Sequence, residues 1–162
     1  MRIIIPFLLI SCLIFGACEE EATFDALKQA ETDRELILEY IAENNLNATE
    51  DSTGVWYVID APGSISRPEP ASIITINYRG ILLNGEEFDS TYGDNEGDVG
   101  TPIRLPLNST IPGWQVGIPK FKKGGKGTLI IPSGFGYGRT RTGNIPSNSV
   151  LVFEKLELVD ID

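Results

Sequence analysis

From residue 55 onward, Gly, Pro, Asn and Asp divide the chain into short stretches that are rich in β-branched and aromatic residues. Apolar and polar residues alternate along several of these stretches, which is typical of strands that are buried on one face. The predicted strands cover residues 55–59, 72–78, 103–107, 128–131 and 150–159. So many short strands limit the fold to one built mainly on an antiparallel sheet.

A hairpin turn and one short helix complete this prediction. Asn84-Gly85 lies between Ile81-Leu82-Leu83 and Glu87-Phe88, and this dipeptide favours a hairpin turn. Residues 113–118 form the single helix expected among the strands. We therefore expect an α+β domain over residues 54–162, in which a curled antiparallel sheet wraps around a short central helix.

A further helix is predicted before the strands, within an acidic tether at residues 18–53. Thr32 and Glu35 have the spacing of a capping box, and Asn44-Asn45 is a suitable C-terminal stop. Four apolar residues recur at helical spacing between them: Leu36, Ile37, Tyr40 and Ile41. The predicted helix covers residues 32–44. It either docks on its own domain or serves as an arm for dimerisation or partner binding.

The N-terminus has the pattern of an export signal. Residues 3–15 are nearly all apolar, but they are too few for a comfortable membrane span. Phe15-Gly16-Ala17-Cys18 resembles a bacterial lipobox, in which residues 1–17 are removed as a lipoprotein signal peptide and Cys18 is acylated. A plain secretory signal is an alternative; a retained membrane helix is another, which Glu19-Glu20-Glu21 disfavours. We expect a lipid-anchored protein of a bacterial cell envelope, on the periplasmic face or the outer-membrane surface.

Composition excludes several kinds of site. The net charge is −10, with 13 basic and 23 acidic residues, which argues against a nucleic-acid partner. The absence of histidine excludes His-based triads, His-type zinc sites and a histidine general base. Cys12 and Cys18 both lie near the N-terminus, so the predicted domain has neither a disulfide framework nor a cysteine-ligated metal. We expect no metal and no cofactor.

Four residues of the predicted domain provide the material for an apolar pocket with one anionic edge: Tyr78, Phe88, Asp89 and Trp114. Such a pocket suits a ligand that is apolar but carries carbonyl groups, such as a prolyl peptide. Taken singly, each residue also has an ordinary structural interpretation. The aromatic residues could be plain core, and Asp89 could cap a turn.

Eight short motifs in a fixed order resolve this ambiguity. They are Tyr78-Arg79-Gly80, Gly85-Glu86-Glu87-Phe88-Asp89-Ser90, Ile111-Pro112-Gly113-Trp114, Gly124-Gly125-Lys126, Ile131-Pro132, Phe135-Gly136-Tyr137-Gly138, Ile145-Pro146 and Leu151-Val152-Phe153-Glu154. In order and approximate spacing, residues 54–160 resemble the FKBP-type peptidyl-prolyl cis-trans isomerases, the family that binds the macrolides tacrolimus and rapamycin. Any one motif is weak, but eight in order are specific.

The resemblance implies a role for each matching residue. Tyr78, Asp89 and Tyr137 would be catalytic, with the Tyr137 hydroxyl donating to a substrate carbonyl and Asp89 beside the twisted amide. Trp114 would form the floor beneath the proline ring, and the Ile111 N–H would donate to a second carbonyl. The substrate-binding residues would be Phe88, Ile103, Ile111, Trp114, Ile145 and Phe153.

The resemblance also implies partners. These are prolyl-containing polypeptide clients, with tacrolimus-type or rapamycin-type macrolides as inhibitors and, through acylated Cys18, a lipid bilayer. We expect a monomeric isomerase that assists the folding of exported proteins. A chaperone that binds proline segments with weak or no turnover, or an interaction module of an envelope complex, is the alternative.

Three departures from the family pattern bear on the pocket. Ile103 stands where the family usually has an aromatic wall, which predicts a more open pocket. The loop at residues 92–100 lacks the basic residue that often pairs with the aspartate at position 89, and it is acidic: Asp94, Glu96 and Asp98. Arg139 and Arg141 make the following flap basic. They either favour acidic client segments or pair with the acidic loop.

Overall fold

The computed structural model describes residues 25–64, 66–93 and 99–162. The predicted signal peptide, Cys18 and the acidic residues at positions 94, 96 and 98 lie outside the described residues. Within the described ranges, no helix is both long enough and apolar enough to cross a membrane.

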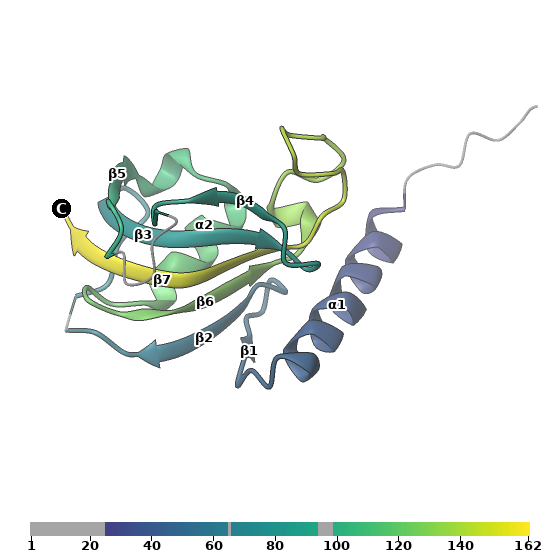
Figure 1. The fold of residues 1–162 in the computed structure, drawn as a ribbon, viewed down its shortest axis with the longest axis horizontal. Helices are drawn as coiled ribbons and strands as arrows, with labels where there is room; N and C mark the ends of the chain where they lie inside the picture. The colour runs from purple at the N-terminus through teal and green to yellow at the C-terminus, as the bar shows by residue number, and fades with distance from the viewer. Residues whose placement is uncertain (1–24, 65, 94–98) are drawn as a thin grey trace, which may run out of the picture.

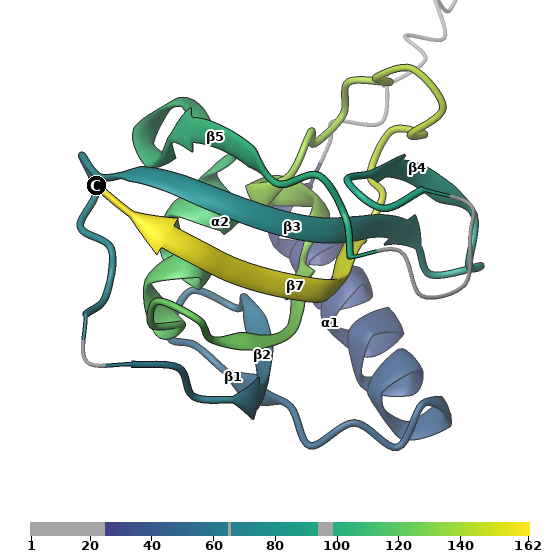
Figure 2. The same ribbon diagram turned by 60° about the vertical axis from the view of Figure 1, so that its left-hand side comes forward.

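The described strands form a single antiparallel sheet. They are β1 (Thr49–Glu50), β2 (Trp56–Ala61), β3 (Ile73–Leu82), β4 (Glu87–Ser90), β5 (Ile103–Pro106), β6 (Lys126–Ile131) and β7 (Leu151–Ile161). Their order across the sheet is β1-β2-β6-β7-β3-β4, and β5 also pairs with β3. Figure 2 shows β5 and β4 following one another along the same edge of β3. The predicted antiparallel α+β fold is confirmed.

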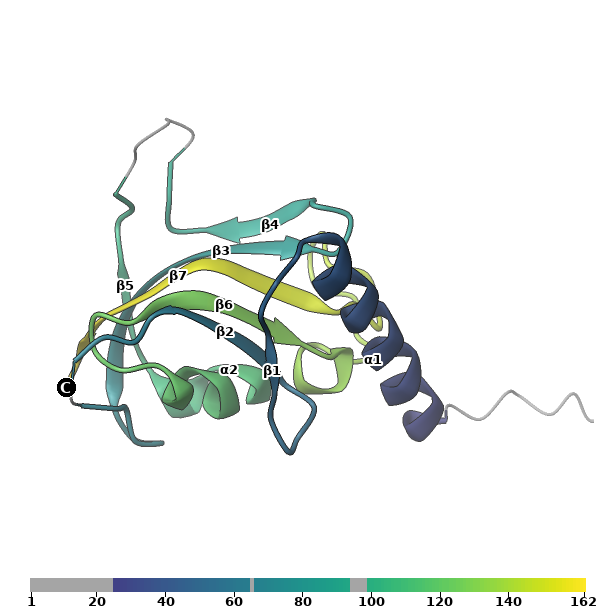
Figure 3. The same cartoon turned by 90° about the horizontal axis from the view of Figure 1, so that it is seen from below.

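The sheet curls over one short helix, α2 (Pro112–Gly117) (Figure 3). Pro112 occupies the first position of the helix, where its missing N–H removes no helical hydrogen bond. The concave face and α2 enclose the main core. Its fully buried members include Ile74, Ile76, Leu107, Ile118, Phe121, Leu129, Leu156 and Leu158. The predicted apolar face of Ile74, Ile76 and Tyr78 is therefore confirmed.

Two strand predictions need correction, those for residues 81–83 and 103–107. The apolar stretch 81–83 is not a separate strand, because β3 continues without a break to Leu82. The hairpin at Asn84-Gly85 is confirmed: the Gly85 N–H donates to the Leu82 carbonyl at 2.9 Å. Further along, β5 ends at Pro106 and is followed by a 3₁₀ turn, η1 (Leu107–Ser109).

A bulge in β7 changes which residues face the core. Strict alternation from Phe153 places Lys155 on the same face, toward the concave core. Lys155 instead has a φ of 49°, and the pairing with β3 slips by one residue there. The extra residue moves Leu156 onto the core face together with Phe153. This is why a lysine is tolerated in the middle of the longest strand.

The N-terminal helix, α1 (Ala26–Glu43), begins earlier than predicted. Asp25 caps it by accepting from the backbone N–H groups of Leu27 at 3.0 Å and Lys28 at 3.2 Å. The predicted capping box is wrong: Thr32 lies inside the helix, where its hydroxyl donates to the Lys28 carbonyl at 3.0 Å. The predicted stop is confirmed, because Asn44 is the C-cap residue.

Helix α1 docks on its own domain, outside the curl of the sheet (Figure 1). Ile37 is 1% exposed and packs on a row of cross-strand neighbours from four strands: Trp56, Ile130, Val152 and Ile81. Arg34 adds a two-pronged contact with Glu50 of β1, at 2.9 and 3.1 Å. The docking interpretation of this helix is confirmed.

Candidate active site

A pocket of about 540 Å³ opens at the concave face, beside α2. This volume is within the range of ordinary small-ligand sites. All nine side chains singled out from the sequence line this one pocket: Tyr78, Phe88, Asp89, Ile103, Ile111, Trp114, Tyr137, Ile145 and Phe153. The fold thus gathers residues from β3, β4, β5, α2, β7 and the loop that precedes β7.

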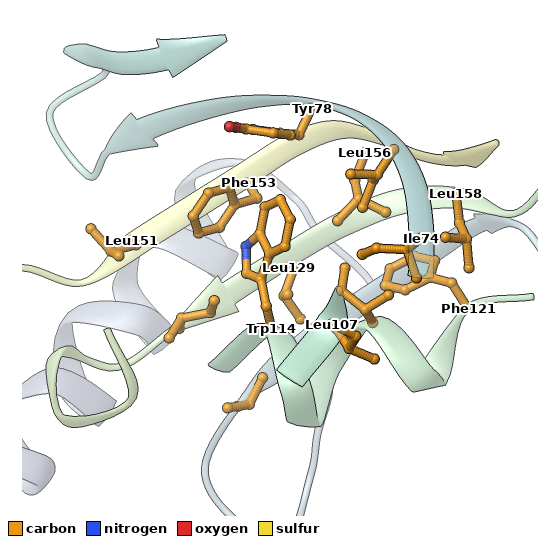
Figure 4. Close-up of a cluster of buried hydrophobic side chains, with 14 of the residues drawn as sticks. Ile74, Tyr78, Leu107, Trp114, Phe121, Leu129, Leu151, Phe153, Leu156 and Leu158 are labelled. Atoms are coloured by element: carbon orange, nitrogen blue, oxygen red, sulfur yellow. The ribbon is translucent and has the colours of Figure 1, made fainter. Parts of the chain in front are cut away.

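Aromatic rings form the floor and one wall of the pocket. Figure 4 shows Trp114 rising from α2 toward Tyr78 and Phe153. The Trp114 ring centre lies 5.0 Å from that of Tyr78 and 5.2 Å from that of Phe153, both edge to face. Phe88 continues the cluster, with its ring 5.7 Å from Phe153. These contacts favour a rigid, apolar surface because each ring is held by the edges of its neighbours.

A glycine on β3 makes room for Phe88. The β3–β4 pairing shifts next to Gly80, and the Phe88 ring lies directly over it. A Cβ atom at position 80 would come within 2.5 Å of the Phe88 ring. Any side chain there would push Phe88 out of the wall, so the glycine of the Tyr78-Arg79-Gly80 motif has a steric role.

The anionic edge is oriented by a hydrogen bond. The Tyr78 hydroxyl donates to Asp89 Oδ2 at 2.5 Å. Burial raises the pKa of Tyr78 well above its ordinary value, and the hydrogen bond and charge of Asp89 raise it further. The tyrosine therefore stays protonated and keeps donating. No salt bridge joins Asp89 to a cation within the described residues.

Two residues that line the pocket carry hydrogen-bond donors, Ile111 and Tyr137. Ile111 is the N-cap residue of α2, and its backbone N–H has no acceptor among the described residues. The preceding carbonyl, of Thr110, accepts from the Gln115 side chain at 2.7 Å, which holds this part of the loop in place. Tyr137 lies on the rim and is 38% exposed. An N–H and an O–H so placed can bind two carbonyl groups of one ligand.

One side of the pocket is open. Ile103 lies on β5, paired with Ile76 of β3, and is 39% exposed. The structure thus agrees with the open pocket that its aliphatic side chain predicts. Sequence reasoning missed six further lining residues: Leu105, Ser109, Thr110, Thr142, Gly143 and Asn144. Alternation along β5 could have indicated Leu105, but no sequence pattern marked the others.

Metal chemistry finds no support in the described part of the chain. It contains no group of three or more His, Cys, Asp or Glu side chains that could hold an ion. The pocket instead offers aromatic surface, two neutral donors and one carboxylate. These groups can bind a ligand and distort it.

Fold and pocket define a class: a curled antiparallel sheet over one short helix, with an aromatic pocket for an apolar ligand that carries carbonyls. The family follows from the sequence. The family model for FKBP-type peptidyl-prolyl cis-trans isomerases matches residues 65–159, and the chain belongs to this family.

Two curated relatives and two solved structures extend the comparison. The chain is 45% identical over 114 residues to the FKBP-type peptidyl-prolyl cis-trans isomerase FkpA of Buchnera aphidicola (subspecies Schizaphis graminum), and 39% identical over 110 residues to FkpA of Escherichia coli K12. These matches cover 70% and 68% of the chain but only 43% and 38% of the relatives. The crystal structure of E. coli FkpA superposes with a TM-score of 0.70 at 34% identity, covering 85% of this chain and 61% of that one. A Pseudomonas syringae peptidyl-prolyl cis-trans isomerase gives 0.68 at 25% identity, covering 86% and 97%.

Proposed function

We propose that this protein is a peptidyl-prolyl cis-trans isomerase. The observation that carries the proposal is the convergence of an aromatic floor, two hydrogen-bond donors and an oriented carboxylate on one pocket. Rotation about an X–Pro bond is slow because the amide must lose its resonance, at a barrier of about 18–20 kcal/mol. No bond breaks, so the enzyme needs only to bind the twisted amide more tightly than the planar one.

The pocket has a part for each portion of the substrate. The proline ring would lie on Trp114, and the Ile111 N–H and the Tyr137 hydroxyl would each hold a flanking carbonyl. Asp89, fixed by Tyr78, would lie beside the amide as it twists. A twisted amide has less charge separation than a planar one, so an apolar surrounding favours it. Each ~1.4 kcal/mol of such preference raises the rate about tenfold.

The direct test is isomerisation of a prolyl tetrapeptide with and without tacrolimus. We expect the wild type to be active and inhibited, and Asp89→Val and Tyr137→Phe each to lose about tenfold in kcat/KM, the value of ~1.4 kcal/mol. Matched controls are Asp60→Val, at an exposed position of β2, and Tyr92→Phe, whose hydroxyl binds the Lys155 carbonyl away from the pocket. A wild type no faster than the two pocket variants would refute the proposal.

A second candidate is a chaperone that holds prolyl segments with little turnover. The exposed wall at Ile103 favours it, because an open pocket admits bulky segments more readily than it constrains a twisted amide. Suppression of aggregation of an unfolded protein would be compared between the wild type and Asp89→Val. Equal suppression by both would support this candidate, whereas loss of suppression with loss of turnover would count against it.

We further propose that the protein is a monomer anchored to a bacterial envelope membrane through acylated Cys18. The lipobox-like Phe15-Gly16-Ala17-Cys18 supports the anchor. Metabolic labelling with a fatty acid should mark the wild type but not Cys18→Ala, and the variant should leave the membrane fraction. Labelling of Cys18→Ala would refute the anchor.

The monomeric state has a separate test. Light scattering of the delipidated protein should give the mass of one chain, and a dimer mass would refute the monomer.

A further inference from the structure

Asp33 is a buried acid that does not line the pocket. It is 1% exposed, on the face of α1 that meets the domain. Its carboxylate accepts three hydrogen bonds: from the Gln29 side chain at 2.8 Å, and from the backbone N–H and the hydroxyl of Ser133, both at 2.7 Å. A buried carboxylate is costly unless its oxygens are satisfied, so this contact is specific and holds Ser133 against the helix.

Ser133 in turn holds the segment that carries Tyr137. It begins a 3₁₀ turn, η3 (Ser133–Phe135), at the end of β6. The Ser133 carbonyl accepts from the N–H groups of Gly136 at 3.0 Å and Gly138 at 2.9 Å, the two residues on either side of Tyr137. A continuous series of hydrogen bonds therefore leads from α1 to the backbone on both sides of Tyr137, which lines the pocket.

The space around residues 133–138 makes these hydrogen bonds important for the position of that segment. A second pocket, of about 310 Å³, is lined by both α1 and the same segment, with Ala30, Asp33, Ser133, Gly134 and Gly138 among its lining. Close packing fixes a backbone only where atoms touch on both sides. Where the described residues leave this pocket beside the segment, the hydrogen bonds to Ser133 supply a directional restraint.

We propose that Asp33 is a positioning residue for Tyr137: through Ser133 it sets where the Tyr137 hydroxyl lies on the rim of the pocket. The helix before the family domain is thereby part of the substrate-binding machinery. The inference rests on the proposed isomerase function, in which that hydroxyl donates to a substrate carbonyl.

The test is a double-mutant cycle of Asp33→Ala and Tyr137→Phe in the full chain. In the wild type, Asp33→Ala should lower kcat/KM for a prolyl tetrapeptide about fivefold, the value of one neutral hydrogen bond. In the Tyr137→Phe background it should have less than a twofold further effect, because the hydroxyl that it positions is already gone. The same cycle is read in parallel from the affinity for tacrolimus by calorimetry.

The matched control is Arg34→Ala. It removes the neighbouring contact of the same helix, with Glu50 of β1, and leaves intact the hydrogen bonds between Asp33 and Ser133. It should change kcat/KM less than twofold in both backgrounds. If Asp33→Ala does not fold, Ser133→Ala replaces it, because it removes only the hydroxyl bond and keeps the backbone bond to Asp33.

The outcomes separate the two claims. If Asp33→Ala leaves kcat/KM of the wild type unchanged, or lowers kcat/KM by the same factor in both backgrounds, Asp33 has a merely structural role and the inference is refuted. If the wild type neither isomerises the peptide nor binds tacrolimus, the proposed function fails and the inference fails with it. If the protein is inactive but binds tacrolimus, the tacrolimus affinities of the same four proteins still test the role of Asp33.

Discussion

The open side of the pocket yields a prediction of improved binding. Ile103 lies on β5, at the edge of the sheet, and 39% of its surface is exposed. Because this side chain borders solvent, Ile103→Phe can extend a ring over the pocket mouth without displacing core residues. The variant restores the aromatic wall that is usual in the family, so it should bind prolyl ligands more tightly.

The expected gain follows from the area that the new ring can cover. An aromatic side chain buries 150–250 Å² in full contact, and a partial contact with a bound proline uses roughly 40 Å² of that. At about 25 cal/mol per Å², this is about 1 kcal/mol, or about fivefold in affinity. The ring touches planar and twisted forms alike, so KM should fall about fivefold while kcat changes less than twofold.

Steady-state kinetics on a prolyl tetrapeptide would separate KM from kcat. Val99→Phe is the matched control, since Val99 is 83% exposed and does not line the pocket. An unchanged or raised KM in Ile103→Phe would show that the open wall does not limit binding. An equal fall in both variants would mean that added surface aromaticity, rather than the pocket, is responsible.

Three further predictions concern stability. Gly127→Ala should cost about 3 kcal/mol or more in denaturant unfolding, because a Cβ would lie 1.9 Å from the Val58 carbonyl oxygen and force β2 away from β6; a cost under 1 kcal/mol would contradict this reasoning. Ile37→Ala should cost about 2–4 kcal/mol by leaving a cavity under α1, and wild-type stability would show that the helix is only loosely docked. A hydrogen bond from Lys120 lowers the pKa of the Asp51 carboxyl to about 2, below its ordinary value of about 4 in an unfolded chain. The Asp51 carboxylate therefore stabilises the fold fully above about pH 4, and progressively less as the pH falls toward 2. Asp51→Asn should therefore remove about 1 kcal/mol at pH 6 but almost nothing at pH 2, and an equal loss at both would refute the assignment.

Local patterns in the sequence were sufficient wherever one interaction dominated. The alternation through Ile74, Ile76 and Tyr78 predicted the core face of β3, because a strand buried on one face must place its apolar residues there. Asn84-Gly85 predicted the hairpin and Asn44 the end of α1, since both depend on the local backbone.

Local patterns failed where a distant contact decided the outcome. Thr32 and Glu35 have the spacing of a capping box, yet α1 continues through them, because Asp25 caps the helix and its inner face is held against the domain. In β7, strict alternation would put Lys155 on the core face with Phe153. The bulge at Lys155 corrects this by an extra residue that no periodicity reveals.

The candidate site divides in the same way. The eight motifs in order identified eight pocket residues by family resemblance, and Ile103 was identified as a departure from the family's aromatic wall. No pattern marked Asp33, which reads in the sequence as one more exposed acid of a helix. It meets Ser133 one hundred positions later in the chain.

The sequence by itself determined the family, the antiparallel class and the residue types of the pocket, because these depend on side-chain chemistry and short-range geometry. Tertiary structure alone decided the bulge in β7 and the link from α1 to the segment of Tyr137. Each of these depends on which surfaces meet when distant segments pack, and the spacing of residues within one segment does not predict such contacts.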